Sequence, residues 1–494
     1  MKSIRLLLLS APLICSGATY HVDCGRGADS NSGLSQAAAW RSVEKVNASK
    51  FQPGDHVLLK SGCAWEGQLV PLSSGAEGSP IVFDRYGAGA KPRIDAAGKV
   101  EDALRLYNVQ FVEVRNLELT NLGPAAAVRR GVHIFLDNFG TAKDIVVAGL
   151  YIHDVNGSNQ RKDNGGITFR TNGNQTASRF DGLTIERNII WKVDRSAIAA
   201  QSYHAMRRHW FPSLNVVIRD NLVEDIGGDG IVPWATDGAL IEHNIARNCN
   251  RRGKSYNAGI WPWSTDNSLF QLNEAAFTRT TQDGQGFDSD YNSQNTLFQY
   301  NYSHDNEGGF LLICSPVKRN QEDNIGNTGT VARYNISRND RTRIFHLSGA
   351  DRTTVEKNAV YVGPELDVQM LLVSDWSGWS TGAVFRDNTF YVDGVARYGH
   401  GVKRIEDGTF TMEPGWGGAQ EIAFEGNHYA GKHVDCPEGA RCAQDAGRRP
   451  AINWSAPEFN PAKPDEFEGF LKKHRQWMMQ TFERQFGRPV KLGR

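Results

Sequence analysis

The sequence predicts an all-β solenoid built from stacked coils of short strands and turns, and two repeated features of its 494 residues support this prediction. From about Val112 onward, runs rich in Val, Ile and Phe end in an asparagine that recurs about every 23 to 39 residues, an interval typical of repeat architectures. A second element, a glycine followed by an apolar residue, opens a strand in successive repeats. Gly, Asn and Asp turns separate the runs, and no long helical period interrupts them.

The recurring asparagines are expected to join neighbouring coils. One coil cannot bury its own apolar face, so parallel stacking is needed to form a continuous core. Side-chain amides stacked at a turn can then bond to backbone groups of adjacent coils. The asparagines are Asn188, Asn221, Asn244, Asn273, Asn301, Asn335, Asn358, Asn388 and Asn427.

The two ends of the chain differ from the repeats. Tyr20 to Asp23, the helix-like stretch Ser42 to Ala48, Gln52 to Leu59 and Gly78 to Phe83 precede the regular coils. A cap is needed there, because the first coil would otherwise expose an apolar end and unpaired strand edges. Together with the repeats, these segments resemble the right-handed parallel β-helix of the pectate-lyase-like superfamily, over nearly the whole mature chain.

This resemblance implies a right-handed parallel β-helix with an N-terminal cap and a C-terminal helical tail. We expect a signal peptide over residues 1–18, the cap and first coils over 19–100, the β-helix catalytic domain over 101–435 and a C-terminal extension over 436–494. Within the extension, Phe467 to Phe486 has apolar and aromatic residues at helical spacing, which predicts a helix packed on the solenoid.

Features of the N-terminus and the cysteines indicate export. Lys2 and Arg5 precede an apolar run from Leu6 to Leu13, and Ser16 to Ala18 supplies the small residues of a cleavage site. We therefore expect a secreted or periplasmic protein that begins near Thr19. The pairs Cys24 with Cys63 and Cys436 with Cys442 are candidate disulfides in such a chain, and Cys249 and Cys314 are expected to be buried thiols.

The charge and the hydropathy of the sequence limit the kinds of partner that we expect. Lys plus Arg equal Asp plus Glu at 55 each, which leaves no basic excess for a nucleic-acid partner. No run after the N-terminal segment reaches the roughly 18 apolar residues that a membrane span needs. We expect a monomer whose partner is a poly- or oligosaccharide.

The glycine-plus-apolar element sets the expected register of the coils. Aligning Gly166, Gly259, Gly286 and Gly309 turns the next residue of each strand, such as Phe287, into the core. Because side chains alternate along a strand, the second and fourth residues after each glycine then face outward. The outward residues are Thr168, Ala199, Val232, Trp261, Asp288 and Leu311 in one column, and Arg170, Gln201, Trp234, Trp263, Asp290 and Ile313 in the other.

These columns predict a substrate groove. Arg170 and Gln201 would lie at one end of a floor made by Trp234, Trp261 and Trp263. Aromatic faces suit the C–H faces of sugar rings, while Arg, Gln and Asp suit hydroxyl and carboxylate groups. Exposed tryptophans on a strand face more often mark a binding surface than decoration.

Asp288 and Asp290 are the predicted catalytic pair. They would lie roughly 6 to 7 Å apart, two strand rises along the chain. Because two carboxylates in a partly desolvated groove cannot both ionise comfortably, one pKa should rise and the pair can supply an acid and a base. An inverting glycosidase holds its two carboxyls about 6.5 to 9.5 Å apart, so this estimate falls at the lower edge of that range.

Four further residues are candidates around this pair. Glu307 is a candidate third acid, His346 could hold a leaving-group oxygen or orient a carboxylate, and Asp305 and Asp229 could bind substrate. Each of these residues could instead have a purely structural role. Acidic residues in solenoid turns often cap Gly-rich bends, and Arg170 could simply pair with a neighbouring acid.

Three functions follow from these residues. The first is a glycoside hydrolase without a cofactor, with Asp288 and Asp290 or Glu307 as acid and base. The second is a polysaccharide lyase, in which Asp288, Asp290 and Asp305 would bind Ca²⁺. A lyase also needs a basic residue, and the available Lys318 and Arg319 lie after the strand. The third is a non-catalytic carbohydrate-binding solenoid.

Overall fold

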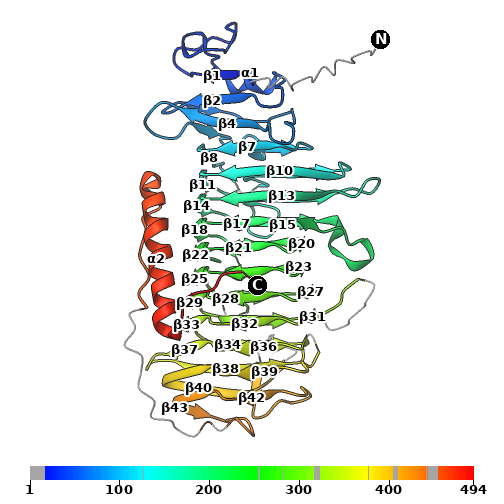
Figure 1. Ribbon diagram of the computed structural model, residues 1–494, viewed down its shortest axis with the longest axis vertical. Helices are drawn as coiled ribbons and strands as arrows, with labels where there is room; N and C mark the ends of the chain where they lie inside the picture. The colour runs from blue at the N-terminus through cyan, green and yellow to red at the C-terminus, as the bar shows by residue number, and fades with distance from the viewer. Residues whose placement is uncertain are drawn as a thin grey trace, which may run out of the picture.

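The protein is a long parallel β-helix whose coils stack along the molecule, with one helix laid against its side (Figure 1). The computed structural model describes residues 17–493 except 126, 254–255, 281, 316–322, 377, 404–409, 441 and 443–453. Residues 1–16, which hold most of the expected signal peptide, lie outside the described residues. In the described part of the chain, no helix is long and apolar enough to cross a membrane.

The strands form three columns along the stack; the third begins at β6, so the first coils lack it. The first column contains β1 (Thr19–Val22), β2 (His56–Lys60), β4 (Ile81–Tyr86), β7 (Val112–Arg115), β10 (Thr141–Ala148), β13 (Arg179–Glu186), β16 (Ser213–Leu214), β17 (Val217–Arg219), β20 (Trp234–Asp237), β21 (Leu240–Glu242), β23 (Trp263–Asp266), β24 (Leu269–Gln271), β27 (Ser293–Gln294), β28 (Leu297–Gln299), β31 (Asn327–Thr328), β32 (Val331–Arg333), β35 (Ala350–Asp351), β36 (Thr354–Glu356), β39 (Val384–Arg386) and β42 (Ala423–Glu425).

The second column contains β3 (Ala64–Glu66), β5 (Arg93–Asp95), β8 (Glu118–Asn121), β11 (Tyr151–Val155), β14 (Ile189–Val193), β18 (Leu222–Ile226), β22 (Ile245–Arg247), β25 (Glu274–Ala276), β29 (Tyr302–His304), β33 (Ile336–Arg338), β37 (Ala359–Val362), β40 (Thr389–Lys403) and β43 (His428–Val434). The third contains β6 (Asp102–Tyr107), β9 (Arg130–Asp137), β12 (Gly165–Asn172), β15 (Ser196–Ser202), β19 (Ile231–Val232), β26 (Gln285–Ser289), β30 (Gly309–Cys314), β34 (Arg343–Ser348), β38 (Asp367–Ser374) and β41 (Phe410–Glu413).

The helices are few and short except for one. They are η1 (Gln36–Ala38), α1 (Val43–Asn47), η2 (Tyr203–Ala205), η3 (Arg207–His209), η4 (Pro464–Glu466) and α2 (Phe467–Phe486). Ser42 caps α1 by accepting a hydrogen bond from the Lys45 backbone N–H. The all-β class and the long C-terminal helix are therefore confirmed, and α2 has the bounds that the apolar spacing predicted.

Strand pairing is parallel between neighbouring coils, and the side chains that alternate inward form a continuous core. Aromatic rings stack along it, for example Phe270 on Phe298 with centroids 4.7 Å apart. Gaps between coils are closed in the same way by Phe287, Phe310 and Phe345. This core holds the three columns rigidly and fixes which side chains point outward.

The predicted asparagine ladder is present at the turn between the first two columns. Asn244 Nδ2, for example, donates to Asn273 Oδ1 at 3.0 Å and to the Ile218 carbonyl at 2.8 Å. The same pair of bonds repeats from Asn188 to Asn388, each time directed to the next asparagine and back to a carbonyl of the preceding coil. Each amide thus satisfies backbone groups that the turn would leave unpaired.

The cysteines pair as the sequence indicated. Cys24 bonds to Cys63 in the N-terminal region, and Cys436 bonds to Cys442. Cys249 and Cys314 are buried free thiols.

Helix α2 lies along the second column (Figure 1). Its first turns pack Phe467, Phe470 and Leu471 on outward residues such as Ile189 and Leu222. Its later turns pack Met478 and Phe482 on another set of outward residues, Leu272, Tyr300, Tyr302 and Ile336. The helix therefore covers an apolar stripe of the second column.

Candidate active site

The third column carries the predicted catalytic pair on its outward side. Phe287 is fully buried in the core, so Asp288 and Asp290 project outward from the same strand region. A carboxylate oxygen of each and Cys314 Sγ lie within 4.8 Å of one another. The expected strand phase is confirmed. The carboxylate oxygens approach more closely than the estimate of roughly 6 to 7 Å, because the side chains lean together.

The register between β26 and the next strand of the column, β30, differs from the expected one. Gln285 pairs with Gly309, so Leu312 lies opposite Asp288 and Cys314 follows Asp290. Leu311 and Ile313, expected outside, are buried in the core. The alignment of Gly286 with Gly309 was wrong by one residue. Gly309, which begins the shifted strand, has a φ of +129°, a conformation that an L side chain rarely adopts.

Burial and mutual repulsion raise the pKa values of the paired aspartates. Burial raises the pKa of Asp288 well above its usual value, and the charge of Asp290 raises it further. Burial also raises the pKa of Asp290, to about 6. Asp288 is only 4% exposed, whereas Asp290 is half-buried. Both carboxyls therefore keep a proton to a higher pH than an ordinary aspartate, and ionisation of one opposes ionisation of the other.

The Asp290 carboxylate is oriented by two donors. The Tyr291 backbone N–H donates to Oδ1 at 2.7 Å, and the Cys314 thiol donates to the same oxygen at 3.2 Å. Burial raises the pKa of Cys314 well above its usual value, so this thiol stays protonated. In the described part of the chain, both donors bind the same oxygen, Oδ1.

A third acid, which the sequence reasoning did not select, joins this pair. Asp283 lies in the turn before β26 and is half-buried. Burial raises its pKa to about 7, and the charge of Asp290 adds to the rise against the opposing charge of Arg343. Arg343 holds this turn by donating to the Asp283 carbonyl at 3.0 Å. We name Asp283, Asp288 and Asp290 the acid cluster.

A lysine and a buried aspartate border the acid cluster. Lys162 Nζ lies 3.5 Å from Asp229 Oδ2 and 4.6 Å from the ring centroid of Trp261. Its positive charge lowers the pKa values of all three members of the cluster. Asp229 is fully buried, 3.1 Å from Arg195, and accepts a bond from Trp261 Nε1. Asp229 therefore anchors Trp261 and Lys162. The sequence predicted that Asp229 contacts the substrate directly, and its complete burial corrects that prediction.

The three tryptophans do not form one open floor. Trp261 lies on the outward side as predicted, but it is only 5% exposed because Lys162 and a small apolar cluster cover it. Its expected stacking on a sugar is therefore corrected. Trp234 and Trp263 are half-buried and contact each other, with ring centroids 4.3 Å apart. The bond from the Asp290 N–H to the Pro262 carbonyl brings Asp290 into register with Trp263.

Arg170 and Gln201 lie in the same outward column, paired across β12 and β15 as expected. The Arg170 guanidinium lies 5.3 Å from the ring centroid of Phe135 on the preceding coil. Both side chains are half-buried. They remain candidates for substrate contact at the N-terminal end of this column.

His346 lies in the Asp288 column, with Leu312 between them. The two strand spacings place it roughly 10 Å from Asp288 along the column. Its Nε2 lies 2.8 Å from Ser374 Oγ, and burial lowers its pKa well below the usual value. Because the ring is 2% exposed and held by neighbours, it supports the wall of the site in its neutral form.

Glu307 and Asp305 lie outside the acid cluster. Glu307 pairs with Arg279 at 2.7 Å and accepts from the Thr280 N–H, and these bonds lower its pKa. Asp305 pairs with His304 at 2.8 Å on the second column. Both residues therefore have the structural role that acidic residues often have in solenoid turns. The prediction that they join the site is corrected.

The comparisons with known proteins agree with this architecture. Residues 165–337 match a family model described as the right handed beta helix region. Lacto-N-biosidase from Bifidobacterium longum subsp. longum is 30% identical over 482 residues, a match that covers 77% of this chain. The chain spans 29% of the length of that relative.

Solved structures give the same picture. Native and selenomethionine crystal structures of the GH136 lacto-N-biosidase from Eubacterium ramulus are 28% and 27% identical to this chain, each with a TM-score of 0.63. Both cover 77% of this chain, and the chain covers 68% and 67% of them. The chain is thus a right-handed parallel β-helix protein that is similar, in sequence and in structure, to lacto-N-biosidases.

Proposed function

We propose that the protein is a glycoside hydrolase that acts at the acid cluster. The observation that carries the proposal is the presence, on one outward surface, of carboxyl groups with raised and different pKa values, about 7 for Asp283 and about 6 for Asp290. Groups separated in this way supply a proton donor and an ionised carboxylate at the same pH. The similarity to lacto-N-biosidases supports the same reaction class.

The two half-buried acids take the two chemical roles. Asp283 keeps its proton up to about pH 7 and donates it to the glycosidic oxygen, so the leaving group departs as an alcohol. Asp290 is ionised above about pH 6 and directs Oδ2 to the anomeric carbon or to the attacking water. Asp288 is too buried for direct contact and acts as a positioning residue that keeps a proton beside Asp290.

The substrate is proposed from the relatives and from the site. A lacto-N-biose unit, after which the similar enzymes are named, would place its rings against the half-buried faces of Trp234 and Trp263. Arg170 and Gln201 would then bind hydroxyl groups further along the column. We propose export as the route to such a substrate, which two disulfides favour.

The donor set of the cluster fits this hydrolase better than a calcium-dependent lyase. A protonated Asp288 and a neutral Cys314 thiol share the space beside Asp290, and neither is a ligand that Ca²⁺ prefers. The basic residues weighed for a lyase, Lys318 and Arg319, lie outside the described residues. Lys162, whose charge also acts on the cluster, already faces Asp229 and Trp261.

A glycoside panel tests the proposal. Purified protein is assayed on aryl glycosides of lacto-N-biose, N-acetylglucosamine, galactose and xylose, with and without a chelator, and the anomer first released is read by NMR. We expect release from at least one glycoside, unchanged by the chelator, and a large loss with Asp283→Asn. Binding without release would indicate a carbohydrate-binding solenoid, and an unsaturated product absorbing in the ultraviolet would indicate a lyase.

A further inference from the structure

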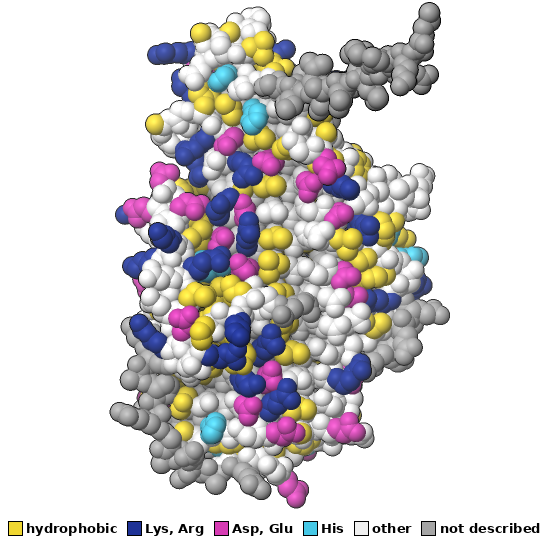
Figure 2. All heavy atoms as spheres, in the orientation of Figure 1, with side chains coloured by type: hydrophobic (Ala, Val, Ile, Leu, Met, Phe, Trp, Pro, Cys, Tyr) yellow, Lys and Arg dark blue, Asp and Glu magenta, His cyan; other side chains and the backbone are white. Residues whose placement is uncertain are grey.

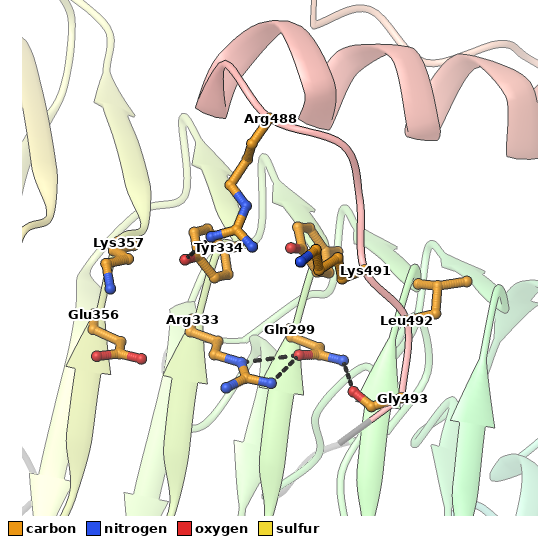
Figure 3. A pocket seen from close by; sticks show the side chains of 10 residues that line it. Gln299, Arg333, Tyr334, Glu356, Lys357, Arg488, Lys491, Leu492 and Gly493 are labelled. Carbon is orange, nitrogen blue, oxygen red and sulfur yellow. Dashed lines mark hydrogen bonds between the residues drawn. The ribbon is translucent and has the colours of Figure 1, made fainter.

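A cavity lies on the first column, away from the acid cluster (Figure 3). Its volume is ≈ 280 Å³, and its base is formed by residues of β28, β32 and β36 and of the turns that follow them. The segment after α2 forms the opposite wall. Gly493 tethers that segment by donating to Gln271 Oε1 at 3.0 Å and accepting from Gln299 Nε2 at 2.6 Å.

Four positive side chains converge on this cavity: Arg333, Lys357, Arg488 and Lys491. Figure 2 shows Lys and Arg side chains gathered on this face of the molecule. In the described part of the chain, none of the four forms an ion pair with a carboxylate. Arg333 donates to Gln299 Oε1 at 2.9 Å, and Arg488 donates to the Tyr334 hydroxyl.

The one carboxylate that lines the cavity is already paired. Arg386 reaches Glu356 Oε2 at 2.6 Å from the next coil. The lining cations are therefore left with polar and aromatic neighbours, such as Tyr334, whose ring centroid lies 4.7 Å from Arg488 and 6.0 Å from Lys357. Four like charges around one small space repel one another, and an anion between them would remove that repulsion.

We propose that this cavity binds a small anion that presents carboxylate, sulfate or phosphate oxygens. Arg and Lys donors are the groups that proteins use for such oxygens. The volume corresponds to about nine water molecules and lies just below the usual range for larger ligands, so it suits a single inorganic anion or one acidic sugar residue. Tyr300 and Arg488 flank the Tyr334 ring, which leaves charge as the main basis of recognition.

Calorimetric titration at low ionic strength tests the proposal. The full-length chain is titrated separately with sodium phosphate, sodium sulfate and D-glucuronate, and with D-glucose as the uncharged control. We expect saturable binding of at least one anion, no binding of glucose, and weaker binding as salt is added. The phosphate, sulfate and glucuronate arms distinguish an inorganic anion from an acidic sugar.

Matched variants locate the binding. Lys357→Gln, on the strand side, and Arg488→Gln, on the tail side, should each weaken binding about tenfold. Lys143→Gln, at an exposed lysine of β10, serves as the control and should leave it unchanged. Lys357→Gln does not touch the tail, so its effect does not depend on tail docking. The proposal is overturned if no anion binds, if glucose binds equally, or if Lys143→Gln weakens binding as much as Lys357→Gln.

Discussion

Two buried clusters of carboxyl groups on different faces of the β-helix have opposite electrostatics. On the third column, the acid cluster has no close ion pair among the described residues, and burial raises the pKa values of its members. On the second column, Glu274 is fully buried but lies 2.5 Å from Arg247 and 2.7 Å from His474 of α2. There the pKa of Glu274 falls well below its usual value despite the burial that opposes the fall.

The comparison shows that the effect of burial on the pKa of a carboxyl group depends on whether the group has a charged partner. Beneath α2, the network around Glu274 extends further, since His474 also contacts His243, which pairs with Asp220 at 2.6 Å. Such a network seats the helix and breaks at high cost when one partner is removed. The acid cluster keeps the repulsion of like charges, an arrangement that stability alone does not favour and that is typical of functional sites.

The largest expected effect comes from Asp290→Asn. Removing the ionised carboxylate should lower kcat/KM by about 10³- to 10⁴-fold on whichever glycoside the wild type cleaves. The unfolding free energy should hold or rise, because a buried charge is lost. Asp305→Asn, on the second column, is the control and should keep nearly full activity. Comparable losses in both variants would contradict the contrast between the two regions.

The second effect concerns stability. Glu274→Ala leaves Arg247 without its carboxylate partner in a buried position, so urea unfolding should show a loss of about 3–5 kcal/mol. Glycosidase kcat/KM of the folded variant should stay close to the wild-type value. Glu274→Gln, which keeps the volume, provides the comparison and should lose less. Unchanged stability of Glu274→Ala would show that the network does not seat α2.

The third effect is the pH profile of activity. Because Asp290 titrates at about 6 and Asp283 at about 7, kcat/KM should be highest between these values and fall about tenfold per pH unit outside them. Initial rates from pH 4 to 9 in overlapping buffers measure both limbs. A flat profile across this range would contradict the assignment of Asp283 as the proton donor and Asp290 as the ionised carboxylate.

Local stability should depend on pH with opposite signs in the two regions. The raised pKa values of the acid cluster give a stabilisation that is complete below the unfolded value near 3.8 and is lost as the pH rises through about 6 to 7. Burial lowers the pKa of His474 to about 4, so its contribution is present above 6.5 and is lost as the pH falls toward 4. Hydrogen exchange of α2 peptides, corrected for intrinsic rates, should therefore speed up from pH 7 to pH 5.

The smallest effect comes from Lys162→Gln. The Lys162 charge lowers the pKa values of the acid cluster, so its removal should raise them and move the activity optimum upward by a fraction of a pH unit. Lys143→Gln, far along the first column, is the control. A downward movement of the optimum would show that Lys162 does not face the cluster in solution.

Much of the fold could be predicted from local patterns. The asparagine ladder, the bounds of α2 and the inward phase of Phe287 follow from spacing and alternation, which act within one coil or between neighbouring coils. The two disulfides were candidates because the chain was expected to be exported. The same reasoning failed between Gly286 and Gly309, because the length of the intervening turns moves the register by one residue without changing the strand pattern.

The sequence by itself determined the stack of coils and the outward direction of Asp288 and Asp290, because side-chain alternation and a repeating core leave few other solutions. Only the tertiary structure decided the surroundings of these acids. Lys162 reaches them from a turn more than 100 residues earlier in the chain, and Asp283 from a turn of its own coil. Their pKa values depend on distances and burial that loops set, and no periodicity in the sequence records those quantities.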